Sequence, residues 1–158
     1  MQSERHEGKD AGCLFCAIVA READASIVFE DETSLAFLDS RPLFHGHCLL
    51  VPKQHHETLA DIPEKLVGPL FSNARRLATV VQEAMGAEGT FVAMNNTVSQ
   101  SVPHFHIHVV PRRRKDGLRG FFWPRGKYEN TQEEKAVRDA LISRIREETS
   151  QPRQAGGK

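Results

Sequence analysis

The stretch HFHIHVV, residues 104–110, decides both the fold and most of the chemistry that the sequence predicts. Imidazoles alternate with apolar residues in this stretch, and the side chains of an extended strand alternate between two faces. We therefore expect the three histidines to share one face, with neighbouring imidazoles roughly 6.6 Å apart. The apolar residues between them would pack into a core on the other face, which would hold the strand and its imidazoles in place.

Three interpretations of this histidine row are open from the residues alone. The row could be the solvent-exposed face of an amphipathic strand, but three neighbouring histidines on one face are an unusual choice for solubility. It could be a metal site, because histidine is the commonest metal ligand. It could also hold a nucleophilic histidine that its two neighbours orient.

Apolar and β-branched residues predict further short strands before and after one long helix. The strands are expected at 26–30, 34–39, 47–52, 90–95 and 104–110. An N-cap at Asp61, with Glu64 completing a capping pattern, predicts a helix that stops near Gly86. A second helix is expected from about Thr131. This order predicts an α+β fold with a mainly antiparallel five-stranded sheet, one long helix and a C-terminal helix.

Composition excludes several classes of protein. The 158 residues are enough for one domain with a core. Lys plus Arg and Asp plus Glu each number 21, so the formal net charge is zero and a generally basic nucleic-acid-binding surface is not indicated. No apolar run approaches the length of a membrane span. Because the first dozen residues lack an apolar signal core and the three cysteines suit a reducing compartment, we expect a cytoplasmic protein.

The segment from Pro103 to Arg112 resembles the His-x-His-x-His-x-x signature of the histidine triad (HIT) superfamily. Three further segments resemble that family in the right order: Cys13–Val19, Leu35–Asp39 and His45–Lys53. The resemblance implies a HIT-like fold. It divides the chain into a flexible tail at 1–12, a HIT domain at 13–112, and a basic and aromatic extension at 113–158 that carries a helix and a frayed end.

The resemblance implies a nucleotide hydrolase that acts at the α-phosphate. His106 would attack phosphorus and form a covalent nucleotidyl-histidine, and water would then release AMP or a similar nucleoside monophosphate. The C-x-x-C start at Cys13 favours the Hint-type branch, which hydrolyses nucleoside phosphoramidates. The Val-Pro-Arg ending at Arg112 is nearer the Fhit-type branch, which cleaves dinucleoside polyphosphates. A nucleotidyltransferase and a nucleotide-binding interaction protein with incidental catalysis remain alternatives.

The resemblance also implies roles for residues around His106. The groups expected to contact the phosphate or the leaving group are His47, His108, Gln100 and Ser101. The groups expected to bind the nucleotide are Asp39, which matches the family's ribose carboxylate, and, in the phosphate loop, Asn95 or Asn96 and Ser99. Ser99 stands where the family usually has glycine, and the loop is shorter than is common.

Cys13 and Cys16 form a C-x-x-C pair, which alone could be a redox motif or two buried hydrophobic residues. Together with His55 and His104 they match a zinc site found in bacterial members of the family, and two cysteines with two histidines make a closed, structural zinc site. His104 would then be a metal ligand and not a catalyst.

The expected partners are a purine nucleotide substrate and a second copy of the chain. The resemblance implies a homodimer whose sheets join edge to edge. The basic run Arg112–Lys115 reads either as a solvated loop or as a rim that attracts polyphosphate. The aromatic segment at 121–125 would close a pocket or contact the partner.

Overall fold

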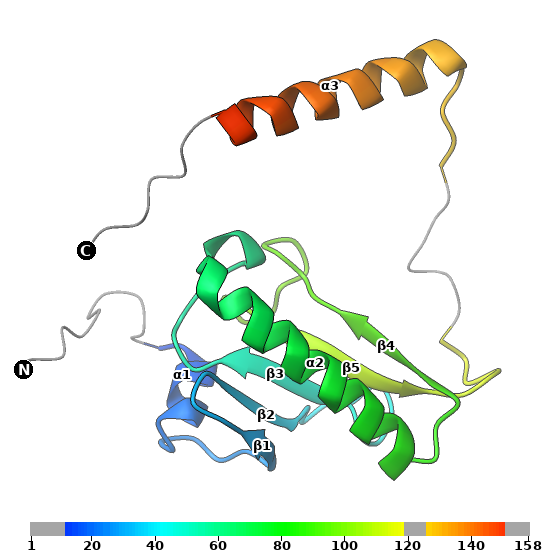
Figure 1. The fold of residues 1–158 in the computed structure, drawn as a ribbon. Helices are drawn as coiled ribbons and strands as arrows, with labels where there is room; N and C mark the ends of the chain where they lie inside the picture. The colour runs from blue at the N-terminus through cyan, green and yellow to red at the C-terminus, as the bar shows by residue number, and fades with distance from the viewer. Residues whose placement is uncertain (1–11, 119–125, 151–158) are drawn as a thin grey trace, which may run out of the picture. The chain divides into compact units, whose positions relative to one another are not determined.

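A five-stranded sheet forms the centre of the computed structural model, which describes residues 12–118 and 126–150. The strand order is β1-β2-β3-β5-β4, and every neighbouring pair is antiparallel (Figure 1). The strands are β1 (Ile27–Glu30), β2 (Ser34–Leu38), β3 (Cys48–Pro52), β4 (Gly89–Ala93) and β5 (Ile107–Arg112). The predicted α+β class with a mainly antiparallel sheet is confirmed.

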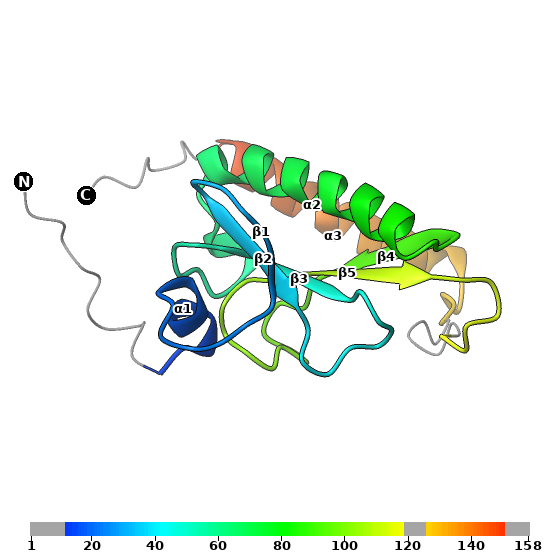
Figure 2. The same cartoon turned by 90° about the horizontal axis from the view of Figure 1, so that it is seen from below.

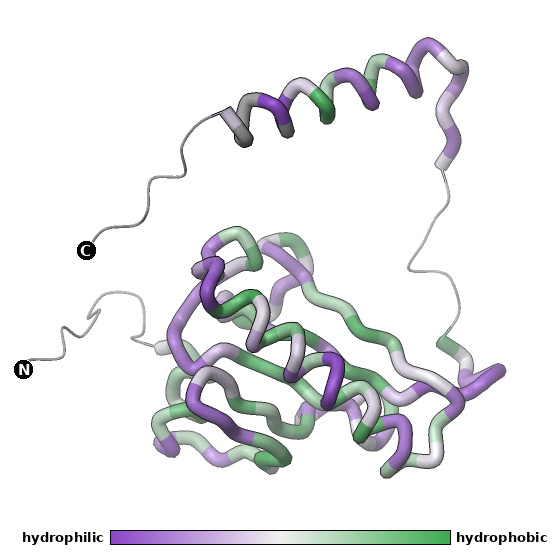
Figure 3. The backbone as a smooth tube through the Cα atoms, viewed as in Figure 1, coloured by the Kyte–Doolittle hydropathy of each residue, from purple (hydrophilic) through white to green (hydrophobic). Residues whose placement is uncertain are grey.

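Helices cover both faces of the sheet. The short helix α1 (Leu14–Val19) lies on one face and the long helix α2 (Glu64–Ala84) on the other (Figure 2). The strands between them are largely hydrophobic, whereas α2 alternates between polar and apolar residues (Figure 3). Two buried clusters result. The α2 face buries Ala36, Cys48, Leu50, Ile62, Leu70, Ala74, Leu77, Val81, Phe105, Ile107 and Val109, and the α1 face buries Phe15, Ile18, Leu35, Phe37, Leu49 and Val51.

The turn between β1 and β2 is held by one carboxylate. Asp31 Oδ1 accepts the backbone N–H groups of Thr33 and Ser34, each at 2.8 Å. Asn73 of α2 donates to Asp31 Oδ2 at 2.6 Å. Burial alone would raise the pKa of Asp31, but these hydrogen bonds to the charged form lower it to about 2. The turn therefore fixes the β1–β2 hairpin and ties it to α2.

The start of α2 differs from the prediction. Asp61 does not cap this helix; its carboxylate accepts the backbone N–H of Thr58 at 2.9 Å and the hydroxyl of Thr58 at 2.7 Å. It thereby closes a capping box around the 3₁₀ turn η1 (Leu59–Asp61). The N-cap of α2 is Pro63, which makes no side-chain capping hydrogen bond. The D-x-x-E interpretation failed because a threonine three residues upstream competes for the same carboxylate.

The histidine-bearing strand starts later than the sequence predicts. Strand β5 begins at Ile107. Two backbone N–H groups upstream bond outside the sheet: His104 N–H donates to the carbonyl of Val102 at 2.8 Å, and Phe105 N–H donates to the carbonyl of His56 at 2.6 Å. The alternation still holds, since the apolar residues between the histidines lie in the cluster under α2.

Two compact units make up the chain, Met1–Asp116 and Gly117–Lys158. The second unit contains α3 (Thr131–Ser150), the predicted C-terminal helix. Within the described residues, no helix combines the length and the apolar character needed to cross a membrane. The expected N-terminal tail lies almost wholly outside the described residues.

Candidate functional site

A cleft of about 760 Å³ opens on the α1 face of the sheet. Four of the predicted site residues line it: Asp39, Ser101, His106 and His108. Apolar side chains from α1 and the strands line much of the rest, namely Leu14, Phe15, Ile18, Phe37, Leu38, Leu49 and Val102. The cleft therefore combines a polar end, where the histidines gather, with an apolar slot.

His106 is buried and held in one orientation. Its Nδ1 lies 2.7 Å from the backbone carbonyl of His104, and only 2 % of the residue is exposed. Because a carbonyl can only accept, the proton of the neutral ring is on Nδ1 and Nε2 carries the lone pair. Phe15 of α1 packs edge-on against the ring, with centroids 5.2 Å apart. The ring that lines the cleft is thus held in one orientation, with a lone pair on Nε2.

His47 and His108 form a hydrogen-bonded pair beside it. The backbone N–H of Leu43 donates to His47 Nδ1 at 3.2 Å, so the proton of a neutral His47 is on Nε2. That Nε2 lies 2.9 Å from His108 Nδ1, which must then accept. The remaining proton of His108 is consequently on Nε2. The hydrogen bond from Leu43 N–H to His47 therefore leaves His108 with a free donor, its Nε2–H, and His108 lines the cleft.

Burial keeps this pair neutral. It lowers the pKa of His47, although the nearby Asp39 carboxylate opposes the shift and His106 adds to it. Burial also lowers the pKa of His108 to about 4, with further lowering by His106 and His47. Both rings are therefore neutral near pH 7, and the proton positions derived above apply there.

Asp39 lies where β2 ends and borders both the cleft and His47. One carboxylate oxygen accepts the backbone N–H of Arg41 at 2.8 Å. The other is 3.7 Å from His47 Nδ1, longer than a hydrogen bond. The side chain is 20 % exposed, so part of it faces the cleft and can accept from a ligand's hydroxyl groups.

The loop before β5 is held by its own side chains. Asn95 Nδ2 donates to the carbonyl of Ser99 at 3.1 Å, and Asn96 Oδ1 accepts from Leu59 of η1 at 2.7 Å. Gln100 accepts from Thr97 N–H at 2.8 Å and donates to the carbonyl of Glu57 at 2.6 Å. In this structure these side chains support the loop, and Ser101 and Val102 are the loop residues that reach the cleft lining.

The residue that stands in place of glycine has a glycine-like backbone. Ser99 has a φ of 61° and Thr97 a φ of 68°, in the left-handed region that favours glycine. The loop therefore keeps a turn conformation that glycine usually supplies, at a cost in backbone strain.

The four predicted zinc ligands lie together. Cys13 Sγ is 3.4 Å from His104 Nδ1, Cys16 Sγ is 3.5 Å from the same nitrogen, and Cys16 Sγ is 3.2 Å from His55 Nδ1. The ligand atoms of the four residues all lie within 4.8 Å of one another. In a tetrahedron with zinc–ligand bonds near 2.0–2.3 Å the donor atoms are roughly 3.6 Å apart, so the cluster matches zinc in size.

The proton on His104 also fits a metal. His104 Nε2 lies 2.8 Å from the carbonyl of Pro52, so Nε2 carries the proton and the lone pair of Nδ1 faces the two sulfurs. Burial lowers the pKa of His104 to about 4, which keeps this lone pair free of a proton. The two thiols and two imidazoles are the donor set of a closed structural zinc site. The carbonyl of Pro52 lies behind one imidazole and orients it.

The basic run after β5 has structural partners within its described part. Arg112 pairs with Asp116 at 2.5 Å, Arg113 donates to the carbonyl of Gly86 at the end of α2, also at 2.5 Å, and Arg114 lies 3.6 Å from Glu88. None of the three arginines is among the residues that line the cleft. The aromatic segment at 121–125 lies outside the described residues.

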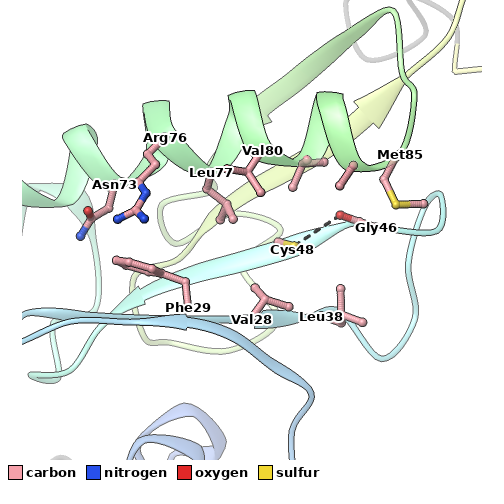
Figure 4. A pocket seen from close by; sticks show the side chains of 12 residues that line it. Val28, Phe29, Leu38, Gly46, Cys48, Asn73, Arg76, Leu77, Val80 and Met85 are labelled. Carbon is pink, nitrogen blue, oxygen red and sulfur yellow. Dashed lines mark hydrogen bonds between the residues drawn. The ribbon is translucent and has the colours of Figure 1, made fainter.

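A second cavity of about 260 Å³ lies on the α2 face, between α2 and strands β1 and β3 (Figure 4). Its walls are mainly apolar, with Leu77 and Val80 above Val28 and Phe29, and Arg76 stacks over Phe29 at 5.3 Å. None of the predicted catalytic or metal residues lines it. The candidate active site is therefore the histidine-lined cleft and not this apolar cavity.

The feature that sequence reasoning missed is α1. Its six residues are too few to show a helical period, yet they supply Leu14, Phe15 and Ile18 to the cleft. The spacing of Cys13 and Cys16 was the available signal, because a metal held by both cysteines would fix Phe15 between them.

Comparison with known proteins agrees with this geometry. Residues 20–115 match the HIT domain family. The chain is 34% identical over 108 residues to adenylylsulfatase HINT3 of Arabidopsis thaliana, an alignment that covers 67% of this chain and 55% of that protein. It is 38% identical over 112 residues to adenosine 5'-monophosphoramidase HNT1 of Saccharomyces cerevisiae, covering 69% of this chain and 68% of that protein.

Solved structures of similar proteins share the fold. A HIT family member from Bacillus subtilis superposes with a TM-score of 0.75 at 28% identity, covering 84% of this chain and 96% of that chain. A zinc-bound histidine triad family protein from Mycobacterium smegmatis superposes with a TM-score of 0.64 at 34% identity, covering 86% and 97%.

Proposed function

The chain belongs to the HIT domain family, and on that premise we propose that it hydrolyses nucleotides at the α-phosphorus through a covalent bond to His106. The product is AMP or a similar nucleoside monophosphate. Two relatives support a nucleotide hydrolase by their names, an adenylylsulfatase and an adenosine 5'-monophosphoramidase. The observation that carries the proposal is that His106 Nε2 has a lone pair that can attack phosphorus, while Nε2 of the neighbouring His108 has a proton to donate.

The first step forms a bond between His106 Nε2 and the α-phosphorus and breaks the bond from phosphorus to the leaving group. The carbonyl of His104 stabilises the proton on Nδ1 as the ring becomes positively charged, and so keeps Nε2 aimed at phosphorus. His108 Nε2–H donates to the phosphate or to the atom that bridges phosphorus and the leaving group, where negative charge develops. It gives this proton to the departing group and recovers a proton from the attacking water in the second step. His47 supports this donor from behind, at 2.9 Å.

The second step reverses the first with water in place of the leaving group. Water attacks phosphorus, the bond from His106 to phosphorus breaks, and His106 is regenerated with the nucleoside monophosphate released. Asp39 binds the ribose hydroxyls from the edge of the cleft, and Ser101 contacts the phosphate. Gln100, Asn95 and Ser99 act less directly, because their contacts shape the loop that carries Ser101.

The substrate class is either nucleoside phosphoramidates or dinucleoside polyphosphates. A steady-state assay of adenosine 5'-phosphoramidate against diadenosine polyphosphates separates the two. His106→Ala is expected to abolish turnover of both while nucleotide binding remains. Retained turnover would contradict the mechanism, and His106→Gly rescued by added imidazole is the positive control. Transfer of the nucleotide to a phosphorylated acceptor instead of water would favour the transferase alternative, and binding without turnover by the unaltered protein would favour the interaction-protein alternative.

Zinc is the proposed cofactor, held by Cys13, Cys16, His55 and His104. When bound, the ion supplies structural cross-linking and no chemistry at phosphorus, because four protein ligands close its coordination shell. The four residues join α1 to the segment that follows β3 and to the segment that precedes β5, and so position Phe15 against His106. The further proposals are a homodimer and a cytoplasmic location.

A further inference from the structure

The cleft extends well beyond the histidines, toward the edge strand β1. Three consecutive residues before β1 line it, namely Asp24, Ala25 and Ser26. Ser26 is placed beside β2, because its carbonyl accepts the N–H of Leu38 at 2.9 Å. Ala25 packs against the buried cluster under α1, whereas Asp24 is exposed at the rim. A carboxylate therefore stands at the β1 end of the cleft, among lining residues that also include Ser26 and Arg41.

The register of the sheet gives the distance from this end to the catalytic strand. His108 pairs with Leu49, Leu49 with Phe37, and Phe37 with Ile27. Three strand spacings separate β5 from β1, which is about 14 Å. A nucleoside monophosphate with its phosphorus at His106 and its ribose at Asp39 reaches along this row, so its base lies over the apolar part and its far edge approaches Asp24.

The chemistry of the far edge depends on the base. In a purine the sugar is attached to the five-membered ring, so the atoms farthest from the phosphate are N1 and the groups on C2 and C6. Guanine presents two adjacent donors there, N1–H and the amino group on C2. Adenine presents an acceptor at N1 and a single donor, the amino group on C6. A carboxylate can only accept hydrogen bonds, so it pairs with both guanine donors, whereas at adenine it gains at most one donor and faces the lone pair of N1.

We infer that Asp24 is a base-selecting residue that makes this chain prefer guanine nucleotides to adenine nucleotides. The inference rests on the proposed function, because that function places phosphorus at His106. It adds a selection that the cleft would otherwise lack, since an apolar slot discriminates weakly between purines of similar shape. Hydrogen bonds to a charged group correspond to roughly a tenfold preference or more.

The test compares guanosine 5'-phosphoramidate with adenosine 5'-phosphoramidate, which share one leaving group. The unaltered protein is expected to show a kcat/KM about tenfold higher for the guanosine substrate. Asp24→Asn is expected to bring the ratio of the two values toward one, mainly through KM, because the base contact is the same before and in the transition state. Glu22→Gln is the matched control: Glu22 is an exposed acid two residues away that does not line the cleft, and its variant keeps the ratio.

A ratio near one in the unaltered protein, or a ratio that Asp24→Asn leaves unchanged, would overturn the inference. Calorimetric binding of GMP and AMP to the same proteins provides a readout that does not need turnover. If neither substrate is hydrolysed but GMP binds more tightly and Asp24→Asn removes that difference, the proposed hydrolysis fails and the base selection stands. Equal binding of GMP and AMP overturns the base selection whatever the turnover.

Discussion

In the proposed mechanism three histidines act through the position of one proton each. In His106 a carbonyl places the proton on Nδ1, and in His108 a relay through His47 places it on Nε2. The alternating pattern of residues 104–110 predicts that His106 and His108 share one face. It does not predict the protons, because the deciding partner of the relay, the N–H of Leu43, comes from a loop 65 residues before His108 in the sequence.

The lowered pKa of His108 makes stability depend on pH. The folded-state pKa is about 4 and the ordinary value is 6.5, so the unfolded chain binds the extra proton between these values. The free energy of unfolding is therefore expected to fall as the pH decreases from about 6.5 to about 4, by up to about 1.4 kcal/mol per pH unit from this group. Above pH 6.5 His108 is neutral in both the folded and the unfolded chain, so this loss in the free energy of unfolding is absent.

Urea denaturation at several pH values tests this dependence. His108→Asn removes the titrating group, so its unfolding free energy is expected to change less steeply with pH than that of the unaltered protein. The groups that face His108, namely His47, His106 and Asp39, remain in both proteins. Equal slopes in the two proteins would show that His108 is not the group responsible.

At the scale of elements, the cluster of Cys13, Cys16, His55 and His104 and one glycine position the site. The cysteines flank the start of α1, and the histidines lie after β3 and before β5. The sequence predicts all four ligands, because chain order and ligand type match a known arrangement. It does not predict α1 itself, since a helix of six residues depends on tertiary contacts for its stability.

Removal of one zinc ligand is expected to lower stability more than catalytic rate. Purified without chelator, the protein is expected to hold about one zinc per chain, and less than about half an equivalent would count against the site. Cys13→Ser is expected to lose the zinc and to melt several degrees lower, because binding free energy is part of folding free energy. Elemental analysis, thermal melting and kcat/KM are the measurements.

The third cysteine supplies the control for that experiment. Cys48 is buried in the α2-face cluster and is not part of the metal group. Cys48→Ala is expected to lower the melting temperature while zinc content stays at one equivalent. Loss of zinc from both variants would mean that general unfolding, and not ligand removal, explains the effect.

Gly46 positions His47 at the start of β3. Its φ is +93°, and a Cβ at this position would lie 2.6 Å from Met85 Cγ at the end of α2. Gly46→Ala is therefore expected to cost roughly 1–3 kcal/mol of stability and to slow turnover by displacing His47. Gly89→Ala is the control, because Gly89 has open space around it and an ordinary φ, and its change is expected to stay within about 0.5 kcal/mol. A stable, fully active Gly46→Ala protein would refute this role.

At the scale of the whole molecule, the sheet leaves two edges, β1 and β4. The order of strands and helices in the sequence predicts the α+β class and five strands, because short alternating segments surround one long amphipathic helix. It does not predict the strand order, in which β5 lies between β3 and β4, since that depends on contacts between residues far apart. An open edge invites pairing with another chain, which is consistent with the proposed homodimer.

Matched substitutions on the two edges test that assembly. Val92 on β4 is 44 % exposed and Val28 on β1 is 49 % exposed. If the dimer joins its sheets at β4, Val92→Asp is expected to give a monomer in analytical ultracentrifugation, whereas Val28→Asp remains a dimer. A monomeric unaltered protein would contradict the dimer, and dissociation by Val28→Asp alone would place the interface at β1.

Mass spectrometry after a rapid denaturing quench tests most directly whether His106 bonds to phosphorus during turnover. During hydrolysis of a nucleoside phosphoramidate, we expect a fraction of the protein to be heavier by one nucleotidyl group, mapped to the peptide that contains His106. His106→Ala is expected to show neither the adduct nor turnover. Sustained turnover by His106→Ala, or an adduct mapped to another residue, would contradict nucleotidyl transfer to His106.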